Sequence, residues 1–356
     1  MSSRLKNIGV VALRWLLGGV FVFSGLVKCV DPVGTSIFVE KYLATYSLDS
    51  FIYLSLPIAV VLSSVEVMMG ILLIIGMFRR RVAVASTLLL IVFTVITLLS
   101  ATLLPIGDCG CFGDAVKLTP WQTFAKNVLL LAASILLWRN SEKSEHSWRS
   151  AVVTIIAAMA LPIAINLYSL RYLPLVDFLP YKVGVELRRE VAQEREMEGV
   201  KSMLIFKNIN TGAVVEFPAD DISCWTDPDI EYVDARTESV VNEDGKFTDL
   251  RIYDRGGEDV TRDLLDRAGR VAWLCVNDAD ALEGTRLNYV ERLFESYPKH
   301  AIAVLTSKDR AFVAKTLGCD VYTIDAMTLR SIMRADVGVM VLNNGVIEFK
   351  SDIRDI

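Results

Sequence analysis

The sequence predicts an α-helical membrane bundle followed by a soluble α/β domain, and three observations support this division. The chain of 356 residues is 53% hydrophobic, and its mean hydropathy of +0.42 is high for a soluble protein. The apolar residues are concentrated in the first half. The charge divides in the same place, because residues 1–175 carry a net charge of +6 and residues 176–356 a net charge of −11. An acidic soluble half argues against nucleic acid as a partner.

Five segments are long and apolar enough to cross a bilayer as helices, which takes about 20 residues. Four of them form a domain expected at residues 1–140, and the fifth lies in residues 141–175. The fifth is the weakest because it contains Pro162 and Asn166, which spans tolerate when neighbouring helices satisfy the freed backbone groups. We expect the first span to be retained, since no signal-peptide cleavage site follows it. The predicted spans are residues 8–29, 51–77, 82–104, 119–138 and 151–170.

Basic residues in the short loops predict the orientation of the bundle. Eight lie on one side and three on the other, and the richer side marks the cytoplasm. The loop between the third and fourth spans and the domain after the fifth are then extracytoplasmic, as in a multi-pass protein of a bacterial inner membrane. If the fifth segment only lies on the membrane, the C-terminal half is cytoplasmic instead. The eight are Arg4, Lys6, Arg79, Arg80, Arg81, Arg139, Lys143 and Arg149, and the three are Lys28, Lys41 and Lys117.

The loop between the third and fourth spans contains two cysteines separated by one glycine. A disulfide between Cys109 and Cys111 would be strained and easily reduced, so it would donate oxidising equivalents readily. A static structural bridge is one alternative. A metal site completed by Asp108 or Asp114 is another, although no His cluster or further Cys cluster lies nearby in the sequence. The whole motif reads Asp108-Cys-Gly-Cys-Phe-Gly-Asp114.

The fourth span carries a clear helix start directly after the cysteine motif. Thr119 can cap the helix, Pro120 suits its first position, and Gln122 completes a capping box. The positive end of this helix and the amine of Lys126, which we expect to reach the outer face, would lower the pKa of a nearby thiol. The two carboxylates of the motif oppose this effect, so the sequence leaves the sign of the net shift open.

Two further residues in the predicted spans are candidate functional groups. Cys29 ends the first span on the outer side, where it could resolve a mixed disulfide with Cys109 or Cys111. The alternative is a small buried thiol at a helix end. Glu66 lies near the middle of the second span, too deep to reach either interface, which makes it a functional candidate. Its alternative is a protonated or hydrogen-bonded residue that holds helices together, and we expect it to face the bundle interior.

Several segments of the first four spans follow one recognisable pattern. They are residues 14–28 with Asp31-Pro32, Glu66-Val-Met-Met-Gly70, residues 76–81, the cysteine motif, Leu118-Thr119 and Thr123-Phe-Ala-Lys-Asn127. Together they resemble DoxX-type membrane proteins, and the cysteine motif resembles the MauE branch of that superfamily. The resemblance covers residues 8–138. It implies a four-span inner-membrane bundle that assists disulfide formation in an exported partner, with Cys109 and Cys111 as the redox pair. It does not imply methylamine metabolism, and the fifth span and the soluble domain depart from the family pattern.

The soluble half has its own organisation. Residues 176–244 predict a charged connector helix followed by short strands, and residues 245–356 alternate strands with helices. The alternation ends in a hairpin at Asn343-Asn-Gly345. The predicted strands are residues 203–206, 213–217, 250–253, 271–276, 301–306, 321–324, 337–342 and 346–349, and the predicted helices in the last domain are residues 281–297 and 309–317.

This order resembles a thioredoxin-like domain whose active site has been lost. The place of the usual Cys-x-x-Cys reads Asn277-Asp-Ala-Asp280, and Val337 stands where thioredoxins have a proline. We therefore expect a thioredoxin-like domain without a redox centre, used to dock a partner or to cover the mouth of the bundle. Cys275 is expected in its core, and Cys224 and Cys319 could pair if folding brings them together.

Two classes of function follow from these features. The first is a membrane thiol–disulfide oxidoreductase, or a component of a disulfide relay, which acts on an exported protein or a redox partner. Its simplest electron acceptor is a membrane quinone, because the sequence has no haem or flavin motif. The second is a non-catalytic membrane scaffold or assembly factor whose cysteines form a structural disulfide. Small-molecule transport is a third option, motivated by Glu66 alone.

Overall fold

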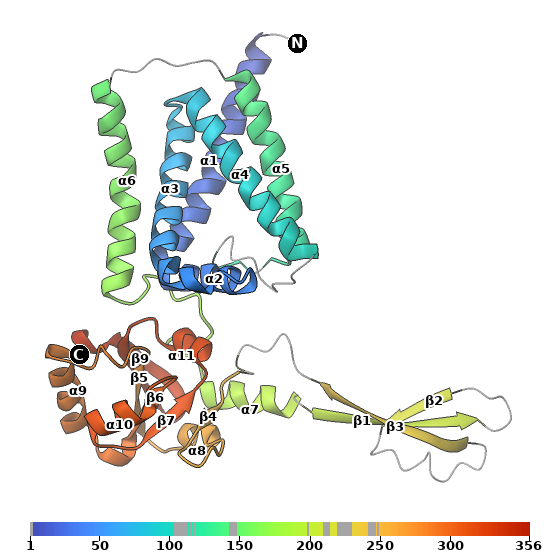
Figure 1. Cartoon of the computed structure of the whole chain (residues 1–356), viewed down its shortest axis with the longest axis vertical. Helices are drawn as coiled ribbons and strands as arrows, with labels where there is room; N and C mark the ends of the chain where they lie inside the picture. The colour runs from blue at the N-terminus through green and yellow to red at the C-terminus, as the bar shows by residue number, and fades with distance from the viewer. Residues whose placement is uncertain are drawn as a thin grey trace. The chain divides into compact units, whose positions relative to one another are not determined.

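A computed structural model describes residues 3–102, 113, 115–116, 118–141, 148–197, 199–208, 214–218, 230–240, 247 and 249–356. The chain divides into two compact units, Met1–Leu179 and Pro180–Ile356. The first unit is helical, and the second is a mixed α/β unit with two separate sheets (Figure 1).

The first unit contains five helices that are long and apolar enough to cross a membrane. Their apolar spans are Ile8–Val30, Asp49–Ile75, Arg79–Thr102, Pro120–Asn140 and Arg149–Arg171. These spans confirm the five predicted from the sequence, with ends that differ by a few residues. The helices are α1 (Ser3–Val30), α3 (Ser55–Ile75), α4 (Arg79–Thr102), α5 (Pro120–Asn140) and α6 (Trp148–Arg171).

A sixth helix, α2 (Pro32–Thr45), lies across the end of the bundle where α1 ends and α3 begins (Figure 1). Its start is well defined, because the Asp31 carboxylate accepts a hydrogen bond from the Gly34 amide at 2.8 Å and Pro32 occupies the first turn. The short 3₁₀ helix η1 (Asp49–Leu54) connects α2 to α3. We did not predict α2, which is too short to span a membrane.

Helices α1 and α3 approach each other closely through three glycines, Gly18, Gly25 and Gly70, which we call the glycine seam. A Cβ atom at Gly70 would lie 2.7 Å from the carbonyl oxygen of Gly18, and one at Gly25 would lie 2.8 Å from the amide nitrogen of Val67. Both distances are too short for any side chain. The two backbones therefore touch, as is common where small residues line a helix contact in membranes.

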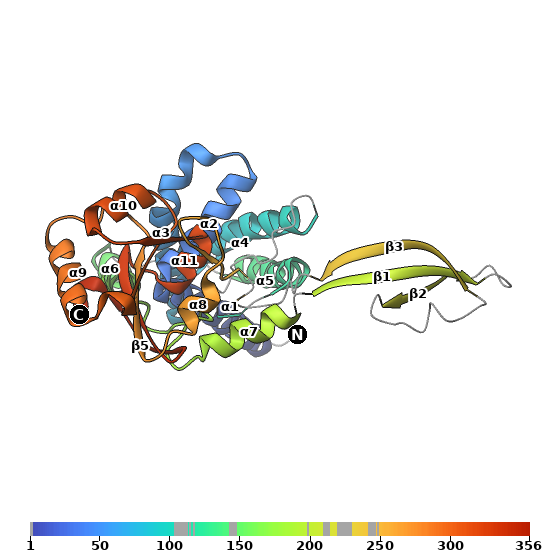
Figure 2. The same ribbon diagram turned by 90° about the horizontal axis from the view of Figure 1, so that it is seen from below.

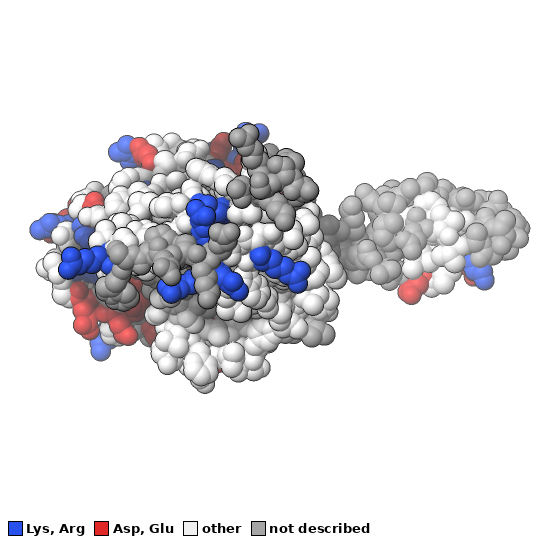
Figure 3. Space-filling model, turned by 90° about the horizontal axis from the view of Figure 1, so that it is seen from above, with Lys and Arg blue, Asp and Glu red and all other residues white. Residues whose placement is uncertain are grey.

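Exposed arginines gather at the opposite end of the bundle, where α3 passes to α4 and where α5 ends. Figure 3 looks at this end and shows Lys and Arg side chains against the largely uncharged surface. It is the end that the basic residues predict to face the cytoplasm. The arginines are Arg79, Arg80, Arg81, Arg139 and Arg149.

The second unit begins with α7 (Leu187–Met197), which leads into a three-stranded antiparallel sheet of order β2-β1-β3 (Figure 2). Its centre is aromatic, since the ring of Phe206 meets those of Phe217 and Tyr232 edge-on at centroid distances of 5.7 and 5.8 Å. The prediction missed its third strand. The strands are β1 (Gly199–Asn208), β2 (Val214–Pro218) and β3 (Ile230–Val240).

The rest of the second unit is built on a six-stranded sheet of order β4-β7-β6-β5-β8-β9. Strands β5, β6 and β7 run parallel, while β4, β8 and β9 each pair antiparallel with their neighbours. The strands are β4 (Ile252–Tyr253), β5 (Arg270–Val276), β6 (Ile302–Thr306), β7 (Val321–Ile324), β8 (Val337–Asn343) and β9 (Val346–Asp352). The helices are α8 (Thr261–Leu265), α9 (Thr285–Ser296), η3 (Lys299–Ala301), α10 (Arg310–Leu317), α11 (Ala326–Ile332) and η4 (Ile353–Asp355).

The hairpin of this sheet and the helix that follows β5 were both predicted from the sequence. The predicted hairpin between β8 and β9 is confirmed, because Asn344 and Gly345 both have positive φ, 50° and 84°, as a tight hairpin turn requires. Helix α9 begins at Thr285, later than the predicted residue 281. Gly284 precedes it with φ of 57°, a left-handed conformation that a continuing helix cannot contain.

Candidate functional site

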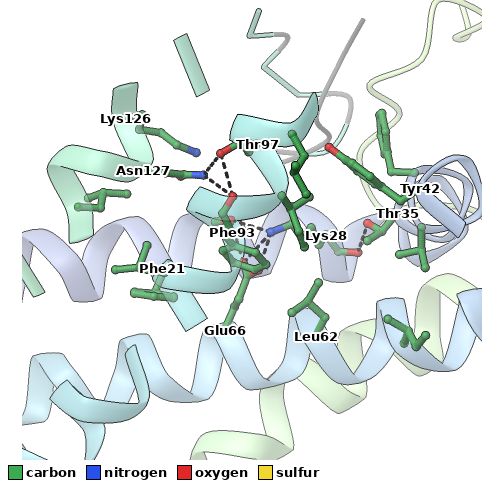
Figure 4. Close-up of a pocket in the computed structure, with 18 of the residues that line it drawn as sticks. Phe21, Lys28, Thr35, Tyr42, Leu62, Glu66, Phe93, Thr97, Lys126 and Asn127 are labelled. Atoms are coloured by element: carbon green, nitrogen blue, oxygen red, sulfur yellow. Dashed lines mark hydrogen bonds and ion pairs between the residues drawn. The ribbon is translucent and has the colours of Figure 1, made fainter. Parts of the chain in front are cut away.

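The interior of the bundle holds a buried ion pair between α1 and α3. Glu66 is 1% exposed and Lys28 is 5% exposed. The Lys28 amine lies 2.7 and 2.8 Å from the two carboxylate oxygens of Glu66, and the Ser24 hydroxyl donates to the same carboxylate at 2.8 Å (Figure 4). The amine also donates to the Ser24 oxygen at 2.9 Å. The three side chains thus form one closed polar network in the middle of an apolar bundle.

The glycine seam explains why this pair can form. Ser24 and Lys28 lie one turn apart on α1, beside Gly25, where α1 and α3 touch. Helical side chains point toward the N-terminus of their helix, so the Lys28 side chain extends back into the span toward Glu66. The sequence placed Lys28 with the basic residues of the outer side. In the structure Lys28 lies buried in the last turn of α1 and not in a loop.

A cavity of about 470 Å³ lies beside the ion pair, between α1, α2, α3, α4 and α5. It runs from Glu66 and Leu130, in the interior of the spans, to Tyr42 and Tyr46 of the α2 region, and it is partly open to the surface. Its wall is almost entirely aliphatic and aromatic, and Lys28 and Phe93 lie next to each other in it (Figure 4). The volume is within the range of about 300–1,000 Å³ that is usual for ligand pockets.

A few polar groups line the same cavity. The Asn127 side chain, which is buried, donates to the Thr97 hydroxyl at 3.3 Å and thereby ties α5 to α4. Lys126 also lines the cavity and lies beside Asn127 in Figure 4. The buried hydroxyl of Tyr46 has no hydrogen-bond partner among the described residues. Lys126 and Asn127 were quoted from the sequence as part of a motif, whereas Tyr46 was missed because it lies in the unpredicted α2 region.

Cys29 lies next to Lys28 but points to another part of the bundle. It is fully buried, and the Asn166 side-chain amide of α6 donates to its sulfur at 3.2 Å. The same amide contacts the hydroxyls of Ser63 and Ser64 at 3.3 and 3.2 Å. Asn166, which weakened the sequence prediction of a fifth span, is therefore the residue whose hydrogen bonds fasten that span to α1 and α3.

The cysteine motif itself is described at one position. Cys109, Cys111, Asp108 and Asp114 lie outside the described residues. Gly113 is buried with φ of 53°, and a Cβ atom at this position would lie 3.4 Å from the Cγ1 of Val27 near the end of α1. Gly113 therefore lies against Val27, the residue that precedes Lys28 in the sequence.

The helix that follows the motif starts as predicted. The Thr119 hydroxyl accepts a hydrogen bond from the Gln122 amide at 3.3 Å, and the Gln122 side chain accepts one from the Thr119 amide at 3.1 Å. Pro120 occupies the first turn. The capping box is confirmed, so the positive end of the α5 dipole lies five residues after the motif.

The helical bundle and the cysteine motif are similar to a known family. Residues 6–139 match the family described as methylamine utilisation protein MauE. This MauE-like region includes α1 to α5 and the cysteine motif, and it confirms the resemblance to MauE seen over residues 8–138. It covers less than half of the chain, and α6 and the second unit lie outside it.

One curated relative also matches. Protein TlpB of Flavobacterium psychrophilum is 26% identical over 129 residues, which are 35% of this chain and 35% of the relative. The chain therefore matches about a third of the length of that relative. No solved structure shows significant similarity.

The described cysteines of the second unit are unsuited to thiol chemistry. Cys275 is fully buried in β5, and this burial raises the pKa of its thiol to about 12. Burial also raises the pKa of the Cys319 thiol, with a further contribution from the neighbouring Asp320 carboxylate. Because the thiolate is the nucleophile, both groups are largely inert at neutral pH. Cys224 lies outside the described residues.

Proposed function

We propose that the chain takes part in thiol–disulfide exchange outside the cytoplasm, with Cys109 and Cys111 as the exchanging pair. The observation that carries this proposal is the contact between Gly113 and Val27. Gly113 is part of the cysteine motif, and it lies beside the end of α1, away from the exposed arginines.

The chemistry follows from the spacing of the two thiols. A disulfide between residues i and i+2 closes a small strained ring, which makes it a good oxidant. A partner thiolate would attack one sulfur, form a mixed disulfide and release the other sulfur as a thiolate. A second partner thiolate would then attack the partner's sulfur in the mixed disulfide and release the sulfur of this chain as a thiolate, leaving the partner oxidised and the Cys109–Cys111 pair reduced. The N-terminus of α5, which follows the motif, would favour the thiolates that this exchange produces, while the carboxylates of Asp108 and Asp114 would oppose this effect.

This function requires the cysteine pair and the second unit to lie outside the cytoplasm of an inner-membrane protein. We expect a membrane-impermeant maleimide to label Cys109 and Cys111 in intact cells only after mild reduction, because the pair is oxidised at rest. In a variant lacking both cysteines, Glu258→Cys, an exposed position of the second unit, should label without permeabilisation, and Asn140→Cys at the arginine-rich end should not. If Asn140→Cys were labelled in intact cells and Glu258→Cys were not, the orientation would be the reverse of the one proposed. Labelling of the pair without reduction would contradict the resting disulfide.

We further propose that residues 245–356 form a thioredoxin-like domain without a redox centre. The order β6-β5-β8-β9, with one parallel and two antiparallel pairings, supports this. Directly after β5, the Asn277 side chain donates to the carbonyl oxygens of Met333 and Ala335 at 2.7 and 2.8 Å. A side chain that bridges to the loop before β8 replaces the reactive thiols of a thioredoxin. Docking of a partner, or covering the mouth of the bundle, is then the role of this domain.

The second unit alone should therefore lack oxidoreductase activity. Residues 180–356, expressed separately, should not catalyse the reduction of insulin by dithiothreitol, because the raised pKa values of Cys275 and Cys319 leave almost no thiolate at pH 7. A thioredoxin with an intact Cys-x-x-Cys is the positive control. Appreciable activity that disappears in a Cys224→Ser variant would reveal a centre in this unit and would contradict the proposal.

A further inference from the structure

The ion pair beside the cavity in the MauE-like region offers no charge to a ligand. The Lys28 ammonium group makes three hydrogen bonds, two to the Glu66 carboxylate and one to the Ser24 oxygen, which uses its three donors. Lys28 and Glu66 are only 5% and 1% exposed. The Tyr46 hydroxyl is also buried by protein atoms and presents no surface to the cavity. A ligand in the cavity therefore meets carbon at the positions where charge and hydroxyl groups lie nearest.

Further polar side chains of the wall are bonded to neighbouring groups of the protein. The Thr35 hydroxyl donates to the carbonyl oxygen of Asp31 at 3.1 Å. The Thr97 hydroxyl donates to the carbonyl oxygen of Phe93 at 2.8 Å and accepts from the Asn127 side chain at 3.3 Å. A ligand that needs hydrogen bonds would have to replace these, which gains little free energy. The wall therefore favours an apolar ligand.

The opening of the cavity lies in an apolar part of the bundle. Among the described lining residues, Leu48 and Ile58 are the exposed ones, at 44% and 40%. Ile58 lies in the first turn of α3, within the membrane span Asp49–Ile75, and Leu48 directly precedes that span. From this opening the cavity extends to Glu66 near the middle of the span. A molecule inside it would run from the end of the span toward its middle, as a lipid chain does in a bilayer.

Water and empty space are poor occupants of such a cavity. Apolar cavities stay dry because water finds no hydrogen-bond partners in them, and an unfilled cavity loses van der Waals contacts along its whole lining. An apolar cavity of about 150 Å³ is enough to bind benzene. The volume of about 470 Å³ is roughly three times as large, so it has room for a chain of roughly a dozen carbon atoms or more.

We propose that the cavity binds one acyl chain of a bilayer phospholipid. The chain passes the opening at Leu48 and Ile58, its methyl end lies near Leu90 and Leu130 of the cavity wall, and its head group stays outside at the α2 end. Phospholipid chains are the hydrocarbon that surrounds Ile58 in a membrane, so they meet the opening at a higher concentration than any other apolar molecule. The site uses no residue of the cysteine motif and does not depend on thiol–disulfide exchange.

The test is photolabelling of the full chain in nanodiscs of phosphatidylethanolamine and phosphatidylglycerol. A small fraction of the phospholipid carries a diazirine at a chosen carbon of one acyl chain. A diazirine at the methyl end should label Leu90 and Leu130, and one near the carboxyl end should label Leu48 and Ile58. Leu90 is the diagnostic position, because it is only 2% exposed and lipid on the outer surface of the bundle cannot reach it.

Variants that fill the cavity should remove the label from Leu90. Leu62 lines the cavity (Figure 4), and the indole of Leu62→Trp should reduce this labelling about tenfold or more, since each methylene excluded lowers the affinity about fourfold. Val61→Trp, at the neighbouring position that is 62% exposed, is the matched control and should leave it unchanged. Leu99→Trp and its exposed neighbour Leu98→Trp repeat the comparison on α4 should Leu62→Trp fail to fold, which gel filtration detects.

Three outcomes would overturn the lipid site. One is equal labelling of Leu90 in folded cavity-filling variants and in their controls. Another is label confined to exposed positions such as Val61 and Val153, which would show lipid on the outer surface only. The third is label that a long-chain isoprenoid quinone removes and added phospholipid does not, which would assign the cavity to an isoprenoid tail. A Cys109→Ser/Cys111→Ser variant should be labelled like the wild type, so a failure of the proposed thiol exchange leaves the lipid site standing.

Discussion

Replacing both Cys109 and Cys111 with serine should abolish disulfide transfer without harming insertion into the membrane. The two thiols are the pair in the proposed exchange, and the helix contacts described for the bundle are made by other residues. Transfer is measured as the rate at which the purified chain reoxidises a reduced, exported model protein such as ribonuclease. Each single variant keeps one thiolate, so a mixed disulfide with the partner should accumulate on a non-reducing gel.

The matched control for this experiment is Cys319→Ser. Cys319 is a free, half-buried thiol of the second unit with a raised pKa, so its loss should change neither transfer nor trapping. A double variant that retains full transfer would remove Cys109 and Cys111 from the mechanism. A pair that stays reduced under oxidising conditions would do the same. A pair that forms a permanent bridge, resistant to reduction by a partner, would favour the scaffold function.

The second large effect is expected at the buried ion pair. Glu66→Gln leaves the Lys28 amine without its counter-charge, and Lys28→Met leaves the Glu66 carboxylate without its own, in an interior where each is almost wholly buried. Removing one partner of such a pair costs about 3–5 kcal/mol. The combined variant Lys28→Met/Glu66→Gln leaves no unpaired charge and should be much less destabilised than either single variant. Thermal unfolding of the detergent-solubilised chain measures all three.

The control is Lys41→Met on α2, the same substitution at an exposed position of the same unit. It should leave the unfolding temperature of the first unit nearly unchanged, because exposed charges contribute little to stability. Additive effects of the two single substitutions in the combined variant would show that Lys28 and Glu66 do not interact, which would contradict the ion pair.

The spans could be predicted from the sequence because the bilayer imposes a length and an apolarity that few other segments satisfy. The buried ion pair could be predicted only in part. The depth of Glu66 was clear from its position in the second span, but its partner was not. Lys28 lies at the end of an apolar run, where a lysine usually extends to the interface. The glycine seam brings α3 against α1, so the Lys28 side chain bonds to Glu66 and does not extend to the interface. This helix contact depends on tertiary packing and could not be predicted from the sequence.

Other features were missed for local reasons. Helix α2 has a recognisable N-terminal signal at Asp31 and Pro32. It was missed because it follows directly on the first span and is too short to be identified as a span itself. Strand β3 contains charged residues at close intervals, among them Glu231, Asp234 and Arg236, so its composition does not resemble a strand. Its pairing with β1 overrides that composition. The cavity is formed by side chains from five helices, and no sequence pattern encodes such a volume.

The glycine seam also has a mechanical consequence. Because the backbones of α1 and α3 touch, these helices cannot move closer together and form one stiff pair. Helices α4 and α5 form a second pair, fastened by the hydrogen bond between Thr87 and Ser134 at 2.8 Å and by that between Asn127 and Thr97. The cavity lies between the two pairs, with α2 at one end, so any change in their separation would change its volume. Such a change would leave the ion pair intact, because Lys28 and Glu66 are both carried by the pair α1 and α3.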